Sequence, residues 1–204
     1  MNEIAYRFPY WGPLVLEVEV EDELISLLLE KGNESMGKNL DHSKHLAGVL
    51  DNQYYYEDFK EWFCPLFDPY INAYINTVSD YKTDCFKNPP DWWKVDSLWI
   101  NYQKPLEYNP PHNHDGDLSF VIYLQVPEEI EQENERAKGN RRNSGPGTII
   151  FDIGPDMPLS ISCIRRMPKA GQAFIFPAWL PHHVNPFKSD VERISVSGNI
   201  NLFK

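Results

Sequence analysis

The sequence contains few cysteines, and they form no pattern. Cys64, Cys85 and Cys163 lie far apart, and none belongs to a Cys-x-x-Cys motif. The wide spacing argues against a zinc knuckle, and the odd, unpatterned set argues against a disulfide framework. We therefore expect a protein of a reducing compartment.

Long apolar runs and a targeting segment are also absent from the sequence. No run reaches the roughly 18 apolar residues that indicate a membrane-spanning helix. Residues 1–6 lack the apolar core of a signal peptide. We expect a cytoplasmic protein with no membrane partner.

Basic residues are scarce relative to acidic ones. The chain has 19 Lys and Arg against 30 Asp and Glu, which gives a formal net charge of -11. An acidic surface repels phosphate backbones, so we expect no nucleic-acid partner. The basic doublets Arg141-Arg142 and Arg165-Arg166 fall in predicted loop or edge positions.

The composition is that of a globular protein, with 42% hydrophobic and 14% aromatic residues. A chain of 204 residues can bury a core as one compact domain, and no internal repeat divides it. Within that domain we expect residues 1–96 to form an N-terminal strand and buttressing helices. Residues 97–204 are expected to form the β core.

The first half of the chain predicts one strand followed by helices. Leu14–Val20 alternates like a half-buried strand. Capping signals and apolar residues at helical spacing predict helices from Asp22 to a stop at Gly32, from Tyr56 to Phe63 and from Pro69 to Lys82.

The second half predicts short strands separated by Gly and Pro, which favours a barrel or sandwich. The charged segment Glu128–Gly147 predicts a mobile insertion between two of these strands. The expected strands are Ser97–Tyr102, Leu118–Val126, Thr148–Ile153, Ser160–Arg165, Ala173–Phe176 and Arg193–Asn201.

Histidines gather at the ends of these strands. His112 and His114 lie two apart on an extended segment, so their imidazoles point to one space. With a distant third ligand, His182, they leave three positions of an octahedron open, as in non-haem Fe(II) oxygenases. A hydrogen-bonded surface loop is the alternative for such a pair. His183 is expected to point away from the site.

Arg193 opens the last predicted strand, and Ser195 shares its face. The planar fork of arginine can hold a carboxylate, so the pair suits the distal carboxylate of 2-oxoglutarate. A surface salt bridge is the ordinary alternative for Arg193. Tyr123 is a second candidate donor and, equally, a candidate core residue.

Taken together, several motifs resemble the 2-oxoglutarate/Fe(II)-dependent oxygenases. The resemblance covers residues 97–204 and is closest to a small branch found in phage and marine bacterial genomes. The motifs are Asn101-Tyr102-Gln103, His112-Asn113-His114, Leu118–Leu124, Phe176–His182, Arg193-Ile194-Ser195 and Asn199.

The resemblance implies a double-stranded β-helix, or jelly-roll, barrel that binds Fe(II), 2-oxoglutarate and O₂. It implies a dioxygenase that decarboxylates 2-oxoglutarate to succinate and CO₂. The second substrate, an amino acid, peptide or small molecule, would be hydroxylated at a C–H bond. His182 matches the distal histidine ligand, and Arg193 matches the carboxylate-binding arginine.

The first histidine pair departs from the family pattern. Most members have His-x-Asp or His-x-Glu, whereas this chain has His112-Asn113-His114. We favour His112, His114 and His182 as ligands, which leaves the native metal open. Asp117 is the alternative carboxylate ligand, and it requires a bulge or turn that Gly116 can supply.

Two other functions remain open. A cupin-like metal-binding protein, or a dioxygenase without a 2-oxo acid, would share the barrel and the histidines but give Arg193 no special role. A non-enzymatic β-protein would bind no metal. Binding of 2-oxoglutarate that depends on Arg193, and metal analysis, distinguish these functions.

Overall fold

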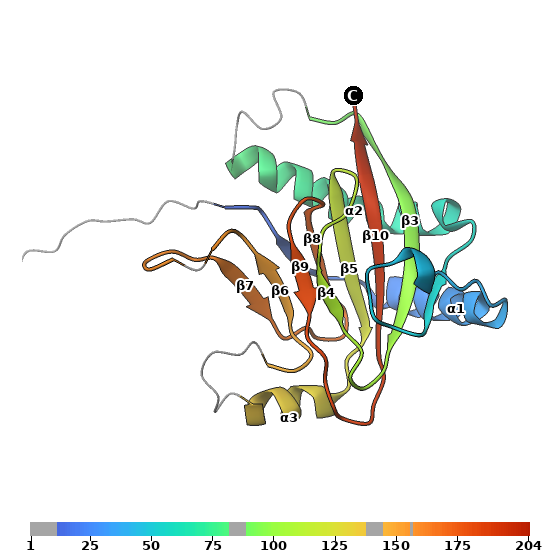
Figure 1. Ribbon diagram of the computed structural model, residues 1–204. Coiled ribbons are helices and arrows are strands. Elements are labelled where there is room, and N and C mark those ends of the chain that lie inside the picture. Colours follow the sequence, from blue (N-terminus) through green and yellow to red (C-terminus); the bar gives the residue numbers. More distant parts are fainter. Residues whose placement is uncertain (1–11, 82–88, 138–144, 156) are drawn as a thin grey trace, which may run out of the picture.

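Two antiparallel sheets form the protein (Figure 1). The computed structural model describes residues 12–81, 89–137, 145–155 and 157–204. The larger sheet contains β1 (Leu16–Glu19), β2 (Gln53–Tyr55), β3 (Trp92–Gln103), β5 (Leu118–Gln125), β8 (Gln172–Pro177) and β10 (Arg193–Phe203). The smaller sheet contains β4 (Asn109–His112), β6 (Ile149–Asp152), β7 (Cys163–Arg166) and β9 (His182–Val184).

The strand order is β1-β8-β5-β10-β3-β2 in the larger sheet and β4-β9-β6-β7 in the smaller one. The strands predicted from the sequence are present, and β2, β4 and β9 are additional. Across the described residues the ladders form two separate sheets, so the predicted barrel is not closed by hydrogen bonds. The mainly β fold with helices is confirmed.

The larger sheet is buried on both faces because its strands alternate between two cores. On β5, Phe120 and Ile122 belong to the core that contains the helices α1 (Asp22–Gly37) and α2 (Phe59–Tyr81). Their neighbours Val121 and Tyr123 belong to the core shared with the smaller sheet. Because successive side chains of a strand point to opposite faces, one face of the larger sheet contacts the helices and the other face can line a site.

The two helices expected at Tyr56–Phe63 and Pro69–Lys82 are one continuous helix, α2. Pro65 and Pro69 lie inside it, although a proline inside a helix costs about 3 kcal/mol or more. The helix nevertheless continues because it buries a long apolar face worth roughly 1.5–3 kcal/mol per side chain. That face is Phe63, Phe67, Ile71, Tyr74, Ile75 and Val78. Lys82 lies outside the described residues.

The segment Glu128–Gly147 lies between β5 and β6, as predicted, but its first part is not a mobile loop, because it forms the helix α3 (Glu128–Ala137). Residues 138–144 of this prediction lie outside the described residues. Two of its residues attach this helix to the rest of the protein. Ile130 is fully buried, and the carboxylate of Glu133 accepts hydrogen bonds from the backbone of Lys188 and from the backbone and hydroxyl of Ser189. Tertiary contacts therefore order a segment that sequence composition alone assigns to a loop.

The helix α1 does not stop at Gly32, as the sequence predicted, but continues to Gly37. Gly32 is instead a packing position. A Cβ there would lie 2.4 Å from Ile100 Cδ1 and 3.1 Å from the Tyr102 hydroxyl. The absence of a side chain lets α1 lie directly on β3. No helix in the described part of the chain is both long and apolar enough to span a membrane.

Gly32→Ala is expected to destabilise the protein by about 1–3 kcal/mol, because the new methyl group overpacks the contact with β3. Gly37→Ala on the same helix is the control, since nothing lies within 4 Å of a Cβ at that position. Urea denaturation of both variants is the measurement. Equal stabilities of the two variants would contradict the packing role of Gly32.

Candidate active site

Backbone hydrogen bonds bring the two histidine segments together. His112 at the end of β4 pairs in register with His182 at the start of β9. The amide of His114 donates to the Ala178 carbonyl at 2.9 Å, and the amide of Ala178 donates to the Asp117 carbonyl at 3.0 Å. The two segments are therefore fixed side by side, and their imidazoles converge.

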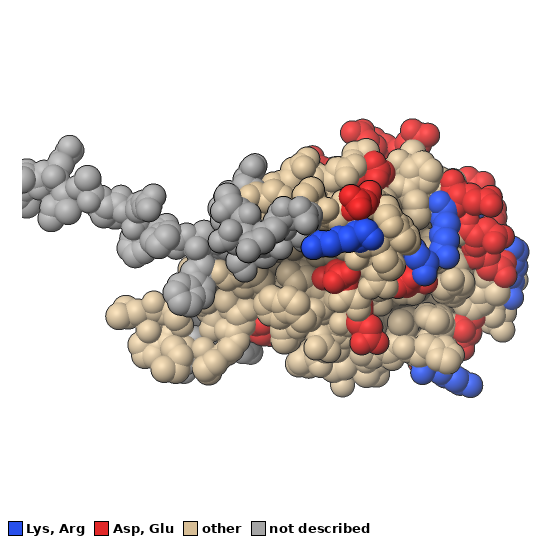
Figure 2. Space-filling model, turned by 90° about the horizontal axis from the view of Figure 1, so that it is seen from above, with Lys and Arg blue, Asp and Glu red and all other residues tan. Residues whose placement is uncertain are grey.

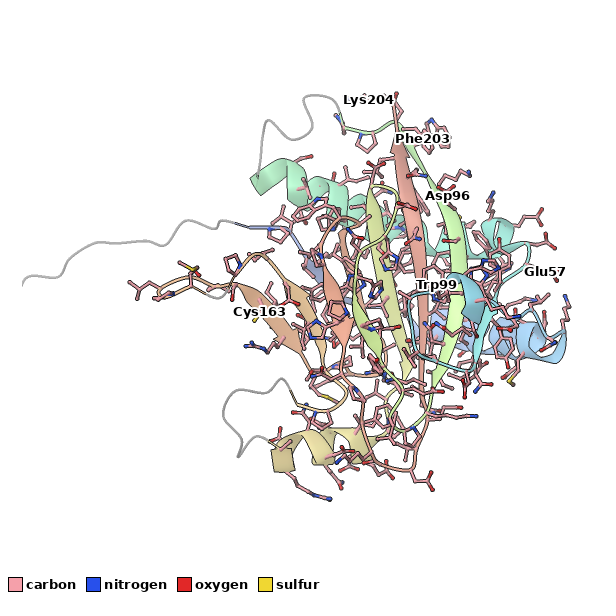
Figure 3. All side chains as sticks on the ribbon, viewed as in Figure 1. Glu57, Asp96, Trp99, Cys163, Phe203 and Lys204 are labelled. Atoms are coloured by element: carbon pink, nitrogen blue, oxygen red, sulfur yellow. The ribbon has the colours of Figure 1, made fainter. Side chains whose placement is uncertain are left out.

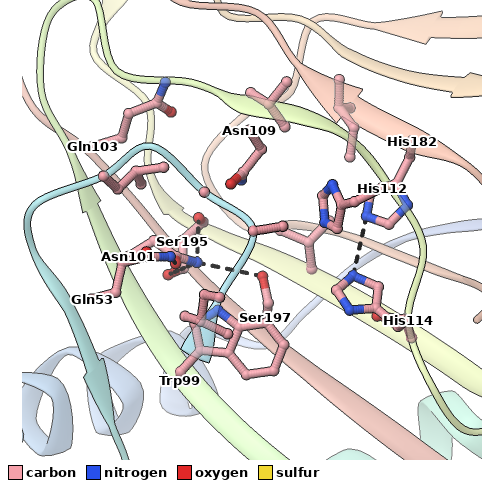
Figure 4. A pocket seen from close by; sticks show the side chains of 18 of the residues that line it. Gln53, Trp99, Asn101, Gln103, Asn109, His112, His114, His182, Ser195 and Ser197 are labelled. Atoms are coloured by element: carbon pink, nitrogen blue, oxygen red, sulfur yellow. Dashed lines mark hydrogen bonds between the residues drawn. The ribbon is translucent and has the colours of Figure 1, made fainter. Parts of the chain in front are cut away.

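The imidazoles of His112, His114 and His182 form one compact cluster, shown in Figure 4. One nitrogen from each ring lies within 4.8 Å of the others. The Nε2 atoms of His114 and His182 are 3.2 Å apart. The convergence expected from the sequence is present in the structure.

Hydrogen bonds to backbone carbonyls orient two of the rings. Nδ1 of His112 lies 2.7 Å from the Pro110 carbonyl, and Nδ1 of His182 lies 3.0 Å from the Leu180 carbonyl. A carbonyl can only accept, so in each ring Nδ1 carries the proton and Nε2 keeps its lone pair. This is the second contact that metal-bound histidines usually make.

Burial keeps the three rings neutral. Loss of water lowers the pKa of His112, lowers the pKa of His114 to about 4 and lowers that of His182 to about 3. Neighbouring imidazoles add to each shift. Three neutral imidazoles whose ring nitrogens converge fit a divalent metal ion such as Fe(II).

Arg193 is a buried cation in the same pocket, with only 3% of its surface exposed. One guanidinium nitrogen donates to the Gly147 carbonyl at 2.6 Å, another donates to Gln103, and Nε has no partner among the described residues. No Asp or Glu among those residues lies close enough to affect its pKa, which burial lowers. A buried, unneutralised guanidinium is costly and is suited to an anionic ligand.

Tyr123 lies directly beside this arginine. The Arg193 guanidinium carbon is 5.3 Å from the centre of the Tyr123 ring. The Tyr123 hydroxyl is buried and has no hydrogen-bond partner among the described residues, and burial raises its pKa. Ser195 pairs in register with Tyr123 and also lines the pocket. The three residues proposed from the sequence for the co-substrate are thus neighbours.

The structure does not bring Asp117 to the histidines. Its exposed carboxylate accepts a hydrogen bond from the Leu202 amide at 2.8 Å. The turn expected at Gly116 exists, with φ of +96°, but it directs Asp117 toward β10. His183 also lies outside the cluster, with its Nδ1 3.0 Å from the Asp152 carboxylate.

Sequence analysis missed several residues of the pocket. Gln53, Trp99 and Asn109 line it together with the histidines and Arg193. Trp99, labelled over the middle of the larger sheet in Figure 3, is buried, and its ring centre is 6.1 Å from that of His114. No local pattern marks Gln53 or Asn109, because they lie on strands of three and four residues.

Comparison with known proteins identifies the family. A family of 2OG-Fe(II) oxygenases matches residues 97–199, half of the chain. The chain belongs to this family. The protein is therefore an enzyme that uses Fe(II), 2-oxoglutarate and O₂. A search of curated proteins gives no match.

Solved structures show that this oxygenase shares its fold with enzymes of different reactions. The viral collagen prolyl hydroxylase of Paramecium Bursaria Chlorella virus-1, solved with 2OG, is 16% identical, with a TM-score of 0.55 and coverage of 91% of this chain and 94% of its own. A Pseudomonas putida prolyl-4-hydroxylase is 13% identical, with a TM-score of 0.55 and 90% coverage of both chains. The carbocyclase SnoK from nogalamycin biosynthesis is 12% identical, with a TM-score of 0.58 and coverage of 93% and 79%.

The histidine cluster predicts how the metal-free oxygenase responds to acid. The unfolded chain takes up protons at histidine near pH 6.5, whereas buried His114 and His182 resist protonation to about pH 4 and about pH 3. The unfolded state binds more protons in that interval, so stability falls as pH decreases below about 6.5. For each of the two histidines we expect a loss of roughly 1–2 kcal/mol by about pH 5.

Urea denaturation of the metal-free protein at about pH 7.5 and about pH 5 measures this loss. His114→Gln should lose less stability on acidification than the wild type. His45→Gln, at an exposed histidine outside the cluster, is the control and should behave as the wild type. The same acid sensitivity in all three proteins would contradict the assignment.

Proposed function

We propose that this oxygenase is a hydroxylase of an amino-acid, peptide or small-molecule substrate, and that it releases succinate and CO₂. The observation that carries the proposal is the buried cation Arg193, without a carboxylate partner among the described residues, in the same pocket as three converging imidazoles. The first feature calls for an anionic ligand and the second for a metal. 2-Oxoglutarate bound to Fe(II) satisfies both.

We assign the metal-binding role to His112, His114 and His182. Bound Fe(II) would supply the oxidative chemistry that removes hydrogen from a C–H bond. The chain supplies the neutral donors, their fixed tautomers and a site shielded from water. Asp117 would have to leave its hydrogen bond with Leu202 to take part. We therefore prefer the all-histidine set.

We assign Arg193, Tyr123 and Ser195 to the distal carboxylate of 2-oxoglutarate. The free Nε–H of Arg193 and the unpartnered Tyr123 hydroxyl are two donors that a carboxylate can satisfy. The cation–π contact holds both groups in place before the ligand binds. Preorganised donors of this kind lose little conformational entropy on binding.

We further propose that the two sheets are the two layers of a double-stranded β-helix and that the chain is one compact domain. Residues 97–204 would be the catalytic core, and residues 1–96 would extend and buttress it. The pairing of β1 with β8 and of β2 with β3 supports this division of roles. Substrate hydroxylation is supported by the two prolyl hydroxylases of similar fold.

The metal assignment predicts one divalent ion per chain in the wild type and its loss in His182→Ala and His114→Ala. Asp117→Asn should keep the metal, because that carboxylate lies outside the cluster. Metal content by elemental analysis after dialysis is the measurement. His183→Ala is the control, since its neighbour ligates and it does not. Loss of metal in Asp117→Asn but not in His114→Ala would establish a carboxylate ligand instead.

The co-substrate assignment predicts that Arg193→Ala weakens 2-oxoglutarate binding about ten- to a hundredfold, because hydrogen bonds to charged groups contribute roughly 1.5–3 kcal/mol. Arg193→Lys should recover only part of the loss, because an ammonium group lacks the fork geometry. Tyr123→Phe, which removes only the hydroxyl, should weaken binding less. Anaerobic titration of the Fe(II)-loaded protein, followed by its visible charge-transfer band, gives the affinities.

Arg166→Ala is the control for charge, because Arg166 is exposed and pairs with Glu17. It should bind 2-oxoglutarate as the wild type does. Metal content should stay the same in all these variants. Equal binding to the wild type and to Arg193→Ala would contradict the assignment. Binding to neither protein would contradict the assignment of this pocket to 2-oxoglutarate.

A further inference from the structure

A row of polar side chains crosses the inner face of the larger sheet. Gln53 on β2 pairs in register with Asn101 on β3, Asn101 pairs with Ser195 on β10, and Ser195 pairs with Tyr123 on β5. All four residues line the pocket. Each end of the row has a buried oxygen without a partner among the described residues: the Tyr123 hydroxyl and Oε1 of Gln53.

The orientation of the Gln53 amide follows from its neighbours. Nδ2 of Asn101 lies 3.4 Å from the Ser195 carbonyl, which can only accept, so this side of Asn101 must be its NH₂ group. Its Oδ1 therefore faces Gln53, which donates through Nε2 at 2.7 Å. Oε1 of Gln53 is then left without a donor, at a residue that is only 1% exposed.

The two unpartnered oxygens need two different ligands. β2 and β5 are three strand spacings apart, or roughly 14 Å. The five-carbon chain of 2-oxoglutarate extends only about 5 Å, judged from backbone bond lengths. A co-substrate held by Arg193 and Tyr123 cannot also reach Gln53. An unsatisfied buried acceptor costs about 1–3 kcal/mol, which a second ligand with a donor would recover.

The surroundings of Gln53 are polar but uncharged. A Cβ on Gly48 would lie 2.3 Å from Asn109 Oδ1 and 3.3 Å from Gln53 Nε2, so Gln53 and Asn109 flank the segment that covers this part of the pocket. Leu46, Leu50 and Trp99 complete the lining here. Apart from the three neutral histidines, Arg193 is the single ionisable basic residue among the described pocket residues, and no Asp or Glu is among them.

We propose that Gln53, Asn109 and Trp99 form the recognition site for the second substrate, and that this substrate is an uncharged secondary amide. The inference rests on the proposed function. The amide N–H donates to Oε1 of Gln53, and Asn109 supplies an amide donor for the carbonyl. A charged group here would be buried without a counter-ion, which is unfavourable.

Trp99 explains how a substrate bound in this way reaches the metal site. Figure 4 shows Gln53 and Asn101 on one side of the pocket, the histidines on the other, and Trp99 between them. The indole is buried, and its ring centre is 6.1 Å from that of His114. The apolar part of a substrate anchored at Gln53 packs on Trp99 and presents its C–H bonds to the histidine cluster.

The test uses a panel of N-acetyl amino-acid N-methylamides that covers the protein amino acids. Each is compared with the free amino acid, and each binding compound with its ester analogue, in which one N–H is replaced by oxygen. Binding to the wild type loaded with Fe(II) and 2-oxoglutarate is measured without O₂ by saturation-transfer NMR and calorimetry. Mass spectrometry after adding O₂ reports hydroxylation.

In the wild type we expect the capped amides to bind at least about tenfold more tightly than the free amino acids. One ester should bind about tenfold more weakly than its amide, because its oxygen faces the Gln53 acceptor. In Gln53→Met the amide and that ester should bind equally. Gln132→Met, at an exposed glutamine on α3, should keep the tenfold difference.

Several outcomes would overturn the inference: no capped amide binds the loaded wild type, free amino acids bind as well, or the ester penalty persists in Gln53→Met. If removal of Gln53 also disturbs Asn101, Asn109→Leu provides a second variant that should lower amide affinity. Gln53→Met should still bind 2-oxoglutarate normally. Failure of the wild type to bind 2-oxoglutarate would instead reject the proposed function, so the two failures are distinguishable.

Discussion

The alternation of β10 between two environments is the constraint on which the rest of the structure depends. Ile194, Val196 and Ile200 face the helices and complete the larger core. Arg193, Ser195 and Ser197, on the other face, line the pocket. β10 pairs with β3 on one side and with β5 on the other, so both neighbours must follow the same alternation. A shift of one residue would bury the arginine among the helices and expose the apolar set to the site.

The site combines groups that are unfavourable in an isolated fold. A buried guanidinium without a carboxylate partner in the described chain and an unpartnered Tyr123 hydroxyl both cost stability. We expect each group to be satisfied when the ligand that we propose for it binds. These unsatisfied polar groups lower the stability of the fold. The apolar core between α1, α2 and the larger sheet is large enough to offset that loss. Acidic residues outnumber basic ones in the chain, 30 to 19, and both kinds are exposed on the face shown in Figure 2. Arg193 is buried, so its positive charge is a local feature of the pocket.

The family match begins at residue 97, so it covers the histidines and Arg193 but not β2. Enzymes that share this fold include prolyl hydroxylases and a carbocyclase. The residues that we assign to the metal and to the co-substrate therefore lie in the matched part of the chain. The Gln53 end of the pocket comes from the N-terminal part of the chain, where a substrate preference of its own can be built without disturbing the oxidative chemistry.

Local sequence determined the strands of the second half, because their alternation is visible over four or more residues. It also marked His112, His114, His182 and Arg193, whose residue types are uncommon enough to attract attention. Only tertiary structure decided which side chains meet. The pairing of residues 112–117 with 177–182 brings the histidines together and directs Asp117 away from them. A contact between Glu133 and residues 188–189 orders α3, and close packing on Ile100 lets α1 continue past Gly32. Gln53 entered the site through a three-residue strand that has no signal of its own. Short-range patterns encode which face a residue occupies, whereas partners distant in the chain decide what that face contacts.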